Sequence, residues 1–300
     1  MTKPEAIRRF VPIAALALAS SGCVINVDGE QVVVRDEHRF TVGEGATVTL
    51  DTFDGSVTVR SWDRPEVRVE VQKRGPDREI AEALDVRATQ EGREVRVEAP
   101  APKVTREFVG IGSFAGPSVS FEVSVPRDIG VTVNTRDGSI AVSGIRGAVT
   151  LQSGDGSIQA QGIDGELRAQ TGDGSIRVSD VSGRASVESG DGSIHVQGRV
   201  DALRARTRDG AVVIEADEGS AMTGDWDVTT GDGSIVFRVP AGFDAEIDAA
   251  SSDGRVRGEI TGLDTAGGTE ERERLRGRLG SGGHVVRLRS GDGSIRVLNR

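Results

Sequence analysis

The stretch that decides the fold is residues 136–216, in which one short phrase returns five times. It reads RDGSI at 136–140, GDGSI at 154–158, 172–176 and 190–194, and RDGAV at 208–212. Each copy begins 18 residues after the copy before it (154 − 136, and the same for the others). A fixed period of this kind is typical of repeat architectures, in which each repeat packs only against its neighbours.

Apolar and polar residues alternate twice within each period, which predicts two short strands per repeat. The apolar positions recur in columns, with Ile158, Ile176, Ile194 and Val212 following Ile140, and Leu167, Ala185 and Leu203 following Val149. An antiparallel meander would not place identical turns at every second corner, whereas a parallel coil rising about 4.8 Å per turn would. The sequence therefore predicts an all-β, single-stranded parallel β-solenoid with coils of about 18 residues.

The rest of the chain is predicted to continue this domain from residue 23 to residue 300. Residues 23–125 are β-rich but irregular, with an early copy of the phrase at Asp54–Val57 and one short helix at 78–84 that Asp77 would cap. Residues 126–300 are expected to form the regular coils. Residues 265–283 are Gly-rich and highly charged, which predicts a mobile excursion from the stack.

Residues 1–22 have the features of an export signal. Lys3, Arg8 and Arg9 precede an uncharged apolar run at 10–19, which is too short to span a bilayer. The following Leu18 to Cys23 resembles a bacterial lipoprotein signal, in which the cysteine becomes the acylated first residue. Cys23 is the one cysteine of the chain, and we expect it to be lipidated; cleavage without lipidation is the alternative, because Ser20 stands where such signals carry leucine. Val24 after Cys23 favours the outer membrane.

The charge of the chain argues against a polyanionic partner. Residues 1–22 carry a net +2, so their removal changes the formal charge from −10 to −12. Nucleic-acid binding depends on neutralising phosphates with clustered basic side chains. We therefore expect no nucleic-acid partner.

Longer segments resemble a known family. They are FDGSVTVRSWDRPEVRVEV at 53–71, FEVSVPRDIGVTVNTRDGSIAVSGIRG at 121–147, and the successive SGDGSI copies. They are similar to the bacterial β-strand-repeat family of candidate adhesins, a domain of unknown function. The resemblance implies a β-repeat fold and defines no catalytic residues.

The repeated acid is the strongest candidate for chemistry. Stacked corners would place the carboxylates about 5 Å apart in a candidate cation ladder, which consists of Asp137, Asp155, Asp173, Asp191 and Asp209. Oxygen-rich, flexible sites of this kind suit calcium. The alternative, which we favour, is that each aspartate caps its own turn while water and salt screen the ladder. Apart from calcium, no metal or cofactor is expected.

No enzyme motif stands out in the sequence. His38, His195 and His284 are isolated, and there is no Gly-x-Ser-x-Gly, Walker or zinc-binding pattern. We therefore expect a non-catalytic, adhesin-like or structural module, exported and held at the cell-envelope membrane by lipid, with an envelope polysaccharide or protein as partner. Two alternatives stay open: a calcium-stabilised surface scaffold and a carbohydrate-active β-helix enzyme.

Overall fold

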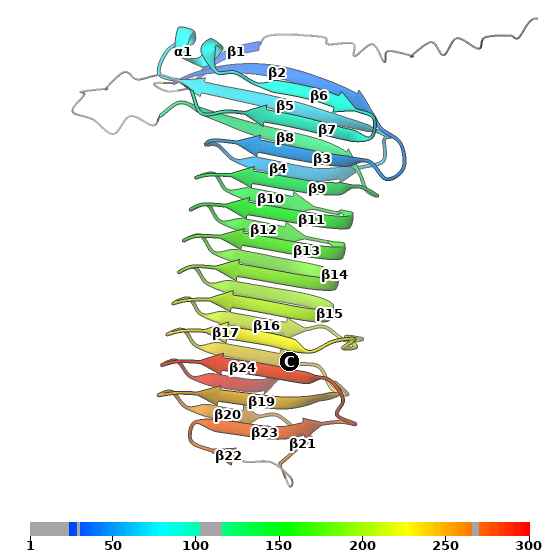
Figure 1. The fold of residues 1–300 in the computed structure, drawn as a ribbon, viewed down its shortest axis with the longest axis vertical. Helices are drawn as coiled ribbons and strands as arrows, with labels where there is room; N and C mark the ends of the chain where they lie inside the picture. The colour runs from blue at the N-terminus through cyan, green and yellow to red at the C-terminus, as the bar shows by residue number, and fades with distance from the viewer. Residues whose placement is uncertain (1–23, 29–30, 103–115, 266–269) are drawn as a thin grey trace, which may run out of the picture.

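The computed structural model describes residues 24–28, 31–102, 116–265 and 270–300. In this part of the chain there are 25 strands and one short helix, so the expected all-β class is confirmed. The strands form an elongated stack of flattened coils (Figure 1). Each coil contributes a strand to each of two walls, and the apolar side chains of both walls meet between them in one continuous core.

Wall 1 is a ladder of strands that pair side by side. In spatial order it contains β6 (Arg87–Glu91), β7 (Glu94–Ala99), β3 (Thr47–Thr52), β9 (Gly130–Thr135), β11 (Arg146–Ser153), β13 (Asp164–Thr171), the second halves of β14 (Ile176–Ser189) and β15 (Ile194–Thr207), β17 (Trp226–Thr230), β24 (Val285–Ser290), β19 (Ala245–Ser251) and β23 (Arg274–Leu279). The short strands β21 (Leu263–Asp264) and β22 (Glu270–Glu271) pair with β23.

Wall 2 is built in the same way on the other side of the core. In spatial order it contains β1 (Val24–Asp28), β2 (Gln31–Thr41), β5 (Glu66–Gly75), β8 (Ser118–Pro126), β4 (Val57–Trp62), β10 (Ile140–Ser143), β12 (Ile158–Gln161), the first halves of β14 and β15, β16 (Val212–Ala216), β18 (Ile235–Val239), β25 (Ile295–Asn299) and β20 (Val256–Glu259).

The 18-residue register is confirmed by the pairing. Ile140 lies opposite Ile158, and Ile158 lies opposite Ile176, on adjacent parallel strands. On wall 1 the same shift pairs Val149 with Leu167. All of these side chains are buried, and burying an aliphatic side chain of this size contributes about 1.5–3 kcal/mol. The apolar columns are therefore the core of the stack.

The ends of the stack differ from a purely parallel solenoid. At the N-terminal end β2 pairs antiparallel with β5, and β5 antiparallel with β8. At the C-terminal end β19 pairs antiparallel with β23. The sheet is therefore mixed. The expected parallel solenoid describes the middle coils and the adjoining pairs β4–β8 and β20–β25, but antiparallel pairing replaces it at both ends. A stack of parallel coils leaves an open edge at each end, and at the N-terminal end two antiparallel hairpins, β1–β2 and β6–β7, extend the two walls.

Two coils lie out of chain order. The coil of β3 and β4 lies between β7 and β8 on one side and β9 and β10 on the other. The coil of β24 and β25 lies between the coil of β17 and β18 and the coil of β19 and β20. The chain thus passes β19 and β20, reaches the end of the stack, and returns one coil earlier.

Short capping segments close both ends. Helix α1 (Arg78–Ala83) follows β5, and the Ile80 N–H donates to Asp77 Oδ1 at 2.8 Å, which confirms the expected cap. The stretch 265–283, expected to be a mobile excursion, contains β23, whose Leu275 and Leu279 are buried in the core. Its mobility stays a prediction.

Candidate functional site

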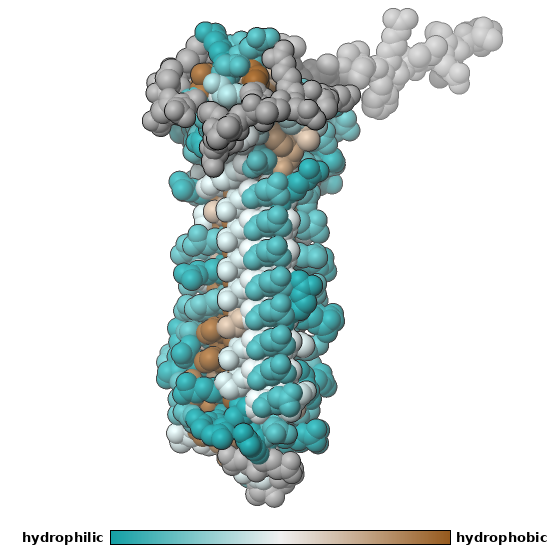
Figure 2. Space-filling model, turned by 90° about the vertical axis from the view of Figure 1, so that its left-hand side faces the viewer, coloured by the Kyte–Doolittle hydropathy of each residue, from teal (hydrophilic) through white to brown (hydrophobic). Residues whose placement is uncertain are grey.

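The DGS corners form one edge of the stack. Wall 1 strands end there and wall 2 strands begin, so each corner carries one phrase, and all five aspartates of the expected cation ladder are exposed at it. Figure 2 faces this edge and shows a vertical row of evenly spaced hydrophilic groups beside a paler row. Strand pairing extends the ladder to nine corners, in the spatial order Asp54, Asp137, Asp155, Asp173, Asp191, Asp209, Asp232, Asp292 and Asp253.

The glycine after each aspartate is needed because neighbouring corners nearly touch. A Cβ atom at Gly156 would lie 2.0 Å from the carbonyl oxygen of Gly138, and one at Gly192 would lie 2.0 Å from that of Gly174. Real Cβ atoms do not approach backbone oxygen so closely, since interiors are packed without room for overlap. The phrase therefore repeats glycine in order to bring successive corners together.

A buried hydroxyl two residues before each aspartate links neighbouring corners. The Ser153 hydroxyl donates to the Gly138 carbonyl at 3.0 Å and accepts from the Gly156 N–H at 2.9 Å. Ser189 repeats both bonds, donating to Gly174 O at 2.9 Å and accepting from Gly192 N at 3.0 Å. The equivalent positions are all serine or threonine and buried: Thr52, Thr135, Ser153, Thr171, Ser189, Thr207, Thr230, Ser251 and Ser290.

This hydroxyl column was missed in the sequence, although its signal is there. Serine or threonine occurs two residues before every aspartate of the ladder, with an 18-residue period from Thr135 to Thr207. We expected each aspartate to satisfy its own turn, but at Asp155 and Asp191 a corner N–H is satisfied by the preceding serine instead. The carboxylates of these two corners are thereby left on the exposed side of the edge.

Among the described residues, one arginine forms ion pairs with aspartates of the ladder. The Arg208 guanidinium lies 2.6 Å from Asp191 Oδ1, and this hydrogen bond raises the arginine pKa above its ordinary value. At the N-terminal end, burial raises the pKa of the Asp54 carboxyl, and the charge of Asp137 adds to the effect. Among the described residues no group of three or more His, Cys, Asp or Glu side chains is arranged to hold a metal ion. Calcium binding by the ladder stays a prediction.

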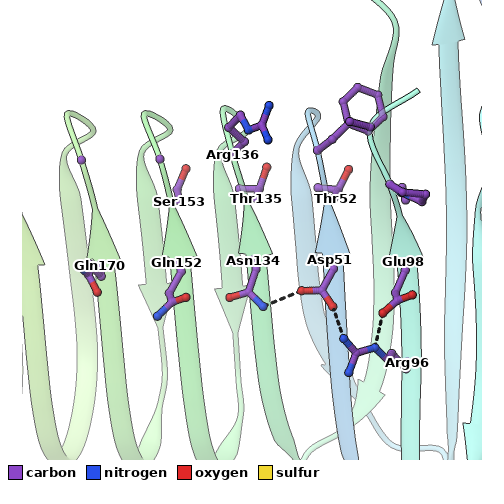
Figure 3. Close-up of a pocket in the computed structure, with 16 residues that line it drawn as sticks. Asp51, Thr52, Arg96, Glu98, Asn134, Thr135, Arg136, Gln152, Ser153 and Gln170 are labelled. Carbon is purple, nitrogen blue, oxygen red and sulfur yellow. Dashed lines mark hydrogen bonds and ion pairs between the residues drawn. The ribbon is translucent and has the colours of Figure 1, made fainter. Parts of the chain in front are cut away.

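A groove lies beside the corners on wall 1, at the N-terminal half of the stack. Its volume is about 810 Å³. The floor is a row of side chains from neighbouring strands in register: Glu98, Asp51, Asn134, Gln152 and Gln170 (Figure 3). Corner residues line one side, and Phe53, Ala99, Pro100 and Ala101 line the end nearest β7. We call this feature the amide groove.

The charged and uncharged parts of the amide groove differ in their internal contacts. Arg96 forms ion pairs with Glu98 and with Asp51, the latter at 3.3 Å (Figure 3). Asn134 Nδ2 donates to Asp51 Oδ1 at 2.7 Å. By contrast, Gln152 and Gln170 are exposed, and their amides make no hydrogen bond to other described residues. These amides are therefore available to a ligand.

The histidines do not come together. His38 lies on β2, where burial lowers its pKa; the negative charge of Asp36 acts in the other direction but is the smaller effect. His195 lies on β15, with Nε2 3.7 Å from Glu215, and His284 precedes β24, with Nδ1 3.6 Å from Asp225. Trp226 is fully buried against Phe237 and Phe243, so it belongs to the core.

The expected lipidation site, Cys23, and the signal at 1–22 lie outside the described residues. Among the residues that are described, no helix has the length and apolar composition needed to cross a membrane.

Comparison with known proteins identifies a family for this chain. A search of curated proteins finds no match. Solved structures with some similarity include a candidate cell adhesion protein from Clostridium sporogenes (13% identity, 89% of this chain and 100% of that one, TM-score 0.34) and a candidate adhesin from Bacteroides fragilis (13%, 89% and 97%, TM-score 0.38). A third is a candidate lipid-binding protein from Parabacteroides distasonis (14%, 88% and 96%, TM-score 0.41).

The family model of the Toastrack DUF4097 domain matches residues 45–298. This range begins just before β3 and ends within β25, so it includes both coils that lie out of chain order. It also includes every corner of the aspartate ladder. The chain therefore belongs to the Toastrack DUF4097 family.

Proposed function

We propose that the mature protein is a cell-envelope lipoprotein in which a β-solenoid, anchored through Cys23, acts as a non-catalytic, adhesin-like binding scaffold. The observation that carries the proposal is the register of the coils, which displays the same kinds of side chain at regular intervals along a rigid stack. Such a surface suits binding to an extended partner better than turnover of a small substrate. The lone cysteine after an apolar signal supports the anchor.

The arrangement of titratable side chains also supports a binding role. The two carboxylates of the amide groove share the ion-paired Arg96, and the histidines lie on separate elements. A nucleophile needs an adjacent base in hydrogen-bonding reach, and the described residues offer no such pair at the groove. The carbohydrate-active alternative predicts shortening of a polysaccharide on incubation with the protein, which end-group analysis would detect.

The anchor and the exposed face can be tested together in intact cells. Cells expressing the protein with a C-terminal tag are labelled with a fatty-acid analogue, alongside a Cys23→Ser variant. We expect label on the wild type and none on the variant. Protease added to intact cells is expected to remove the tag. Label retained by Cys23→Ser would contradict the anchor, and a tag protected until the outer layer is opened would replace the adhesin-like role with a periplasmic one.

A further inference from the structure

We propose that the amide groove binds an uncharged polysaccharide chain. This inference specifies a ligand for the proposed binding scaffold and rests on the proposed function, because the protein meets surface or envelope glycans only if it is located in the cell envelope. It starts from two side chains, Gln152 and Gln170, that lie in register on β11 and β13 and whose amide donors and acceptors are unused by the part of the chain that the structure describes. Primary amides present two N–H donors and a carbonyl acceptor, which match hydroxyl groups that both donate and accept.

The spacing of the floor fits a linear ligand. Asn134, Gln152 and Gln170 contribute one amide per coil (Figure 3), so successive amides are about 4.8 Å apart. A row of this kind presents the same hydrogen-bonding groups repeatedly along one line. A polymer with a hydroxyl-bearing repeat can contact several amides at once, whereas a compact solute reaches one or two.

The charge of the groove favours a neutral ligand. Among its lining residues, the negative charges of Asp51 and Glu98 are balanced by the positive charges of Arg96 and Arg136. Arg96 already forms ion pairs with both carboxylates. The exposed aspartates at the adjacent corners add negative potential, which would repel a polyanion such as a uronic-acid polymer over a distance of about 8 to 10 Å. An anionic chain is therefore disfavoured.

The groove also differs from the sites that peptides and lipids use. Its floor is the outward face of wall 1, whose backbone is already paired on both sides, so a peptide cannot add to it as a further strand. An acyl chain in the groove would cover the amides of the floor without offering them hydrogen bonds, which costs free energy. Its end wall, Phe53 with Ala99 and Pro100, gives an apolar surface for the C–H face of a sugar ring.

Affinity electrophoresis of the purified full-length mature protein tests the inference. The gels contain a neutral glucan, mannan or galactan, or the anionic polymers alginate and polygalacturonate. We expect at least one neutral polysaccharide to retard the protein and the anionic ones to leave it unaffected. In the double variant Gln152→Ala with Gln170→Ala we expect the affinity to fall about tenfold, because hydrogen bonds from two amides are lost.

The chain offers a matched control on the opposite wall. Gln159 and Gln161 on β12 are also exposed glutamines, and Gln159→Ala with Gln161→Ala should bind as the wild type does. Circular dichroism of both variants checks that the fold is kept. Three outcomes would overturn the inference: no retardation by any neutral polysaccharide, retardation by the anionic polymers alone, or equal affinities of the groove variant and the wild type.

The outcomes for the two proposals are separable. The gel experiment uses purified protein, so its result does not depend on lipidation or on which side of the membrane the stack faces. If the protein is lipidated and shaved from intact cells but no glycan retards it, the amide groove is wrong and the proposed function stands. If a glycan retards it but the Cys23→Ser variant still labels, the anchor fails and the groove stands.

Discussion

Asp54 and Asp137 occupy neighbouring corners of one ladder, although they are 83 positions apart in the sequence (137 − 54). The link is visible in the backbone, where the Val57 N–H donates to the Ser139 carbonyl at 3.0 Å. It is also visible in the electrostatics, because burial and then the charge of Asp137 raise the pKa of Asp54. The irregular first part of the chain and the regular coils thus share one edge.

This relationship predicts a stabilising substitution. A carboxyl whose pKa is higher in the folded protein than in the unfolded chain binds protons more readily when folded, so its ionisation lowers stability as the pH rises through that range. Asp54→Asn should therefore raise the free energy of unfolding at neutral pH by about a few tenths of a kcal/mol, since solvent screens much of the effect. The gain should disappear at acid pH, where Asp54 is protonated. Urea titrations at several pH values measure it; a gain independent of pH would contradict the explanation.

The close approach of corners makes Gly156 intolerant of a side chain. Gly156→Ala places a methyl group 2.0 Å from the Gly138 carbonyl oxygen, and we expect destabilisation of about 3 kcal/mol, because the backbone of neighbouring corners must move. Gly43→Ala is the matched control, since a Cβ atom there meets nothing within 4 Å. Thermal melts followed by circular dichroism compare the two. Equal Tm values for both variants would show that the corners are further apart than described.

The hydroxyl column predicts a difference between Ser189, which precedes one copy of the repeated phrase, and Ser175, which lies within another. Ser189→Ala leaves the Gly174 carbonyl and the Gly192 N–H without their buried partner and should cost about 1–3 kcal/mol. Ser175→Ala removes an exposed hydroxyl and should change stability by less than about 0.5 kcal/mol. Chemical denaturation resolves this difference, and the opposite order would refute the bridging role.

Asp248 on β19 links two neighbouring strands, β24 and β23, through ion pairs. It lies 2.8 Å from Arg289 on β24 and 3.4 Å from Arg276 on β23. Burial acts to raise the pKa of Asp248, but the hydrogen bonds and charges of these arginines outweigh it and the net shift is downward. Asp248→Asn should therefore cost about 1–2 kcal/mol at neutral pH.

The sign of its pH dependence is opposite to that of Asp54. A depressed folded pKa gives stability that is present above the unfolded pKa and lost as the pH falls through the folded one. The difference in the free energy of unfolding between the wild type and Asp248→Asn should accordingly disappear as the pH is lowered. Asp253→Asn, at an exposed corner of the same end, serves as the control and should behave as the wild type at neutral pH.

Calcium tests the acid ladder as a binding site. We expect calcium to leave the Tm of the protein nearly unchanged, because water and salt screen the exposed carboxylates and Arg208 already pairs with Asp191. Calcium at one hundred times the Kd of a site would raise the free energy of unfolding by about 2.7 kcal/mol. A stabilisation of that size with calcium and none with magnesium would favour the calcium-stabilised scaffold. The double variant Asp155→Asn with Asp173→Asn should then lose this stabilisation.

Local pattern predicted the middle of the fold and missed its ends. The columns under Ile140 and Val149 follow from the 18-residue period, because each coil repeats the environment of the coil before it. The position of β24 and β25 could not be read in this way. Their phrase identifies a coil but not its neighbours, and the coil of β19 and β20, which precedes them in sequence, lies beyond them in the stack.

The groove escaped prediction for a related reason. Gln152 and Gln170 share a column of the regular repeat, but Asp51, Arg96 and Glu98 come from strands without the 18-residue spacing. Only the insertion of β3 between β7 and β9 brings these residues together. A site assembled from repeat and non-repeat segments requires the spatial order of the strands, which no periodicity supplies.

The late position of β24 and β25 in the sequence makes the C-terminal end of the stack depend on pairing between distant segments. The coils from β9 to β18 follow chain order, so each can pair with the coil before it. The coil of β19 and β20 instead has the coil of β24 and β25 between it and the coil of β17 and β18. This end of the stack therefore has a higher contact order than the middle, which slows folding and leaves its sheet edges unpaired for longer.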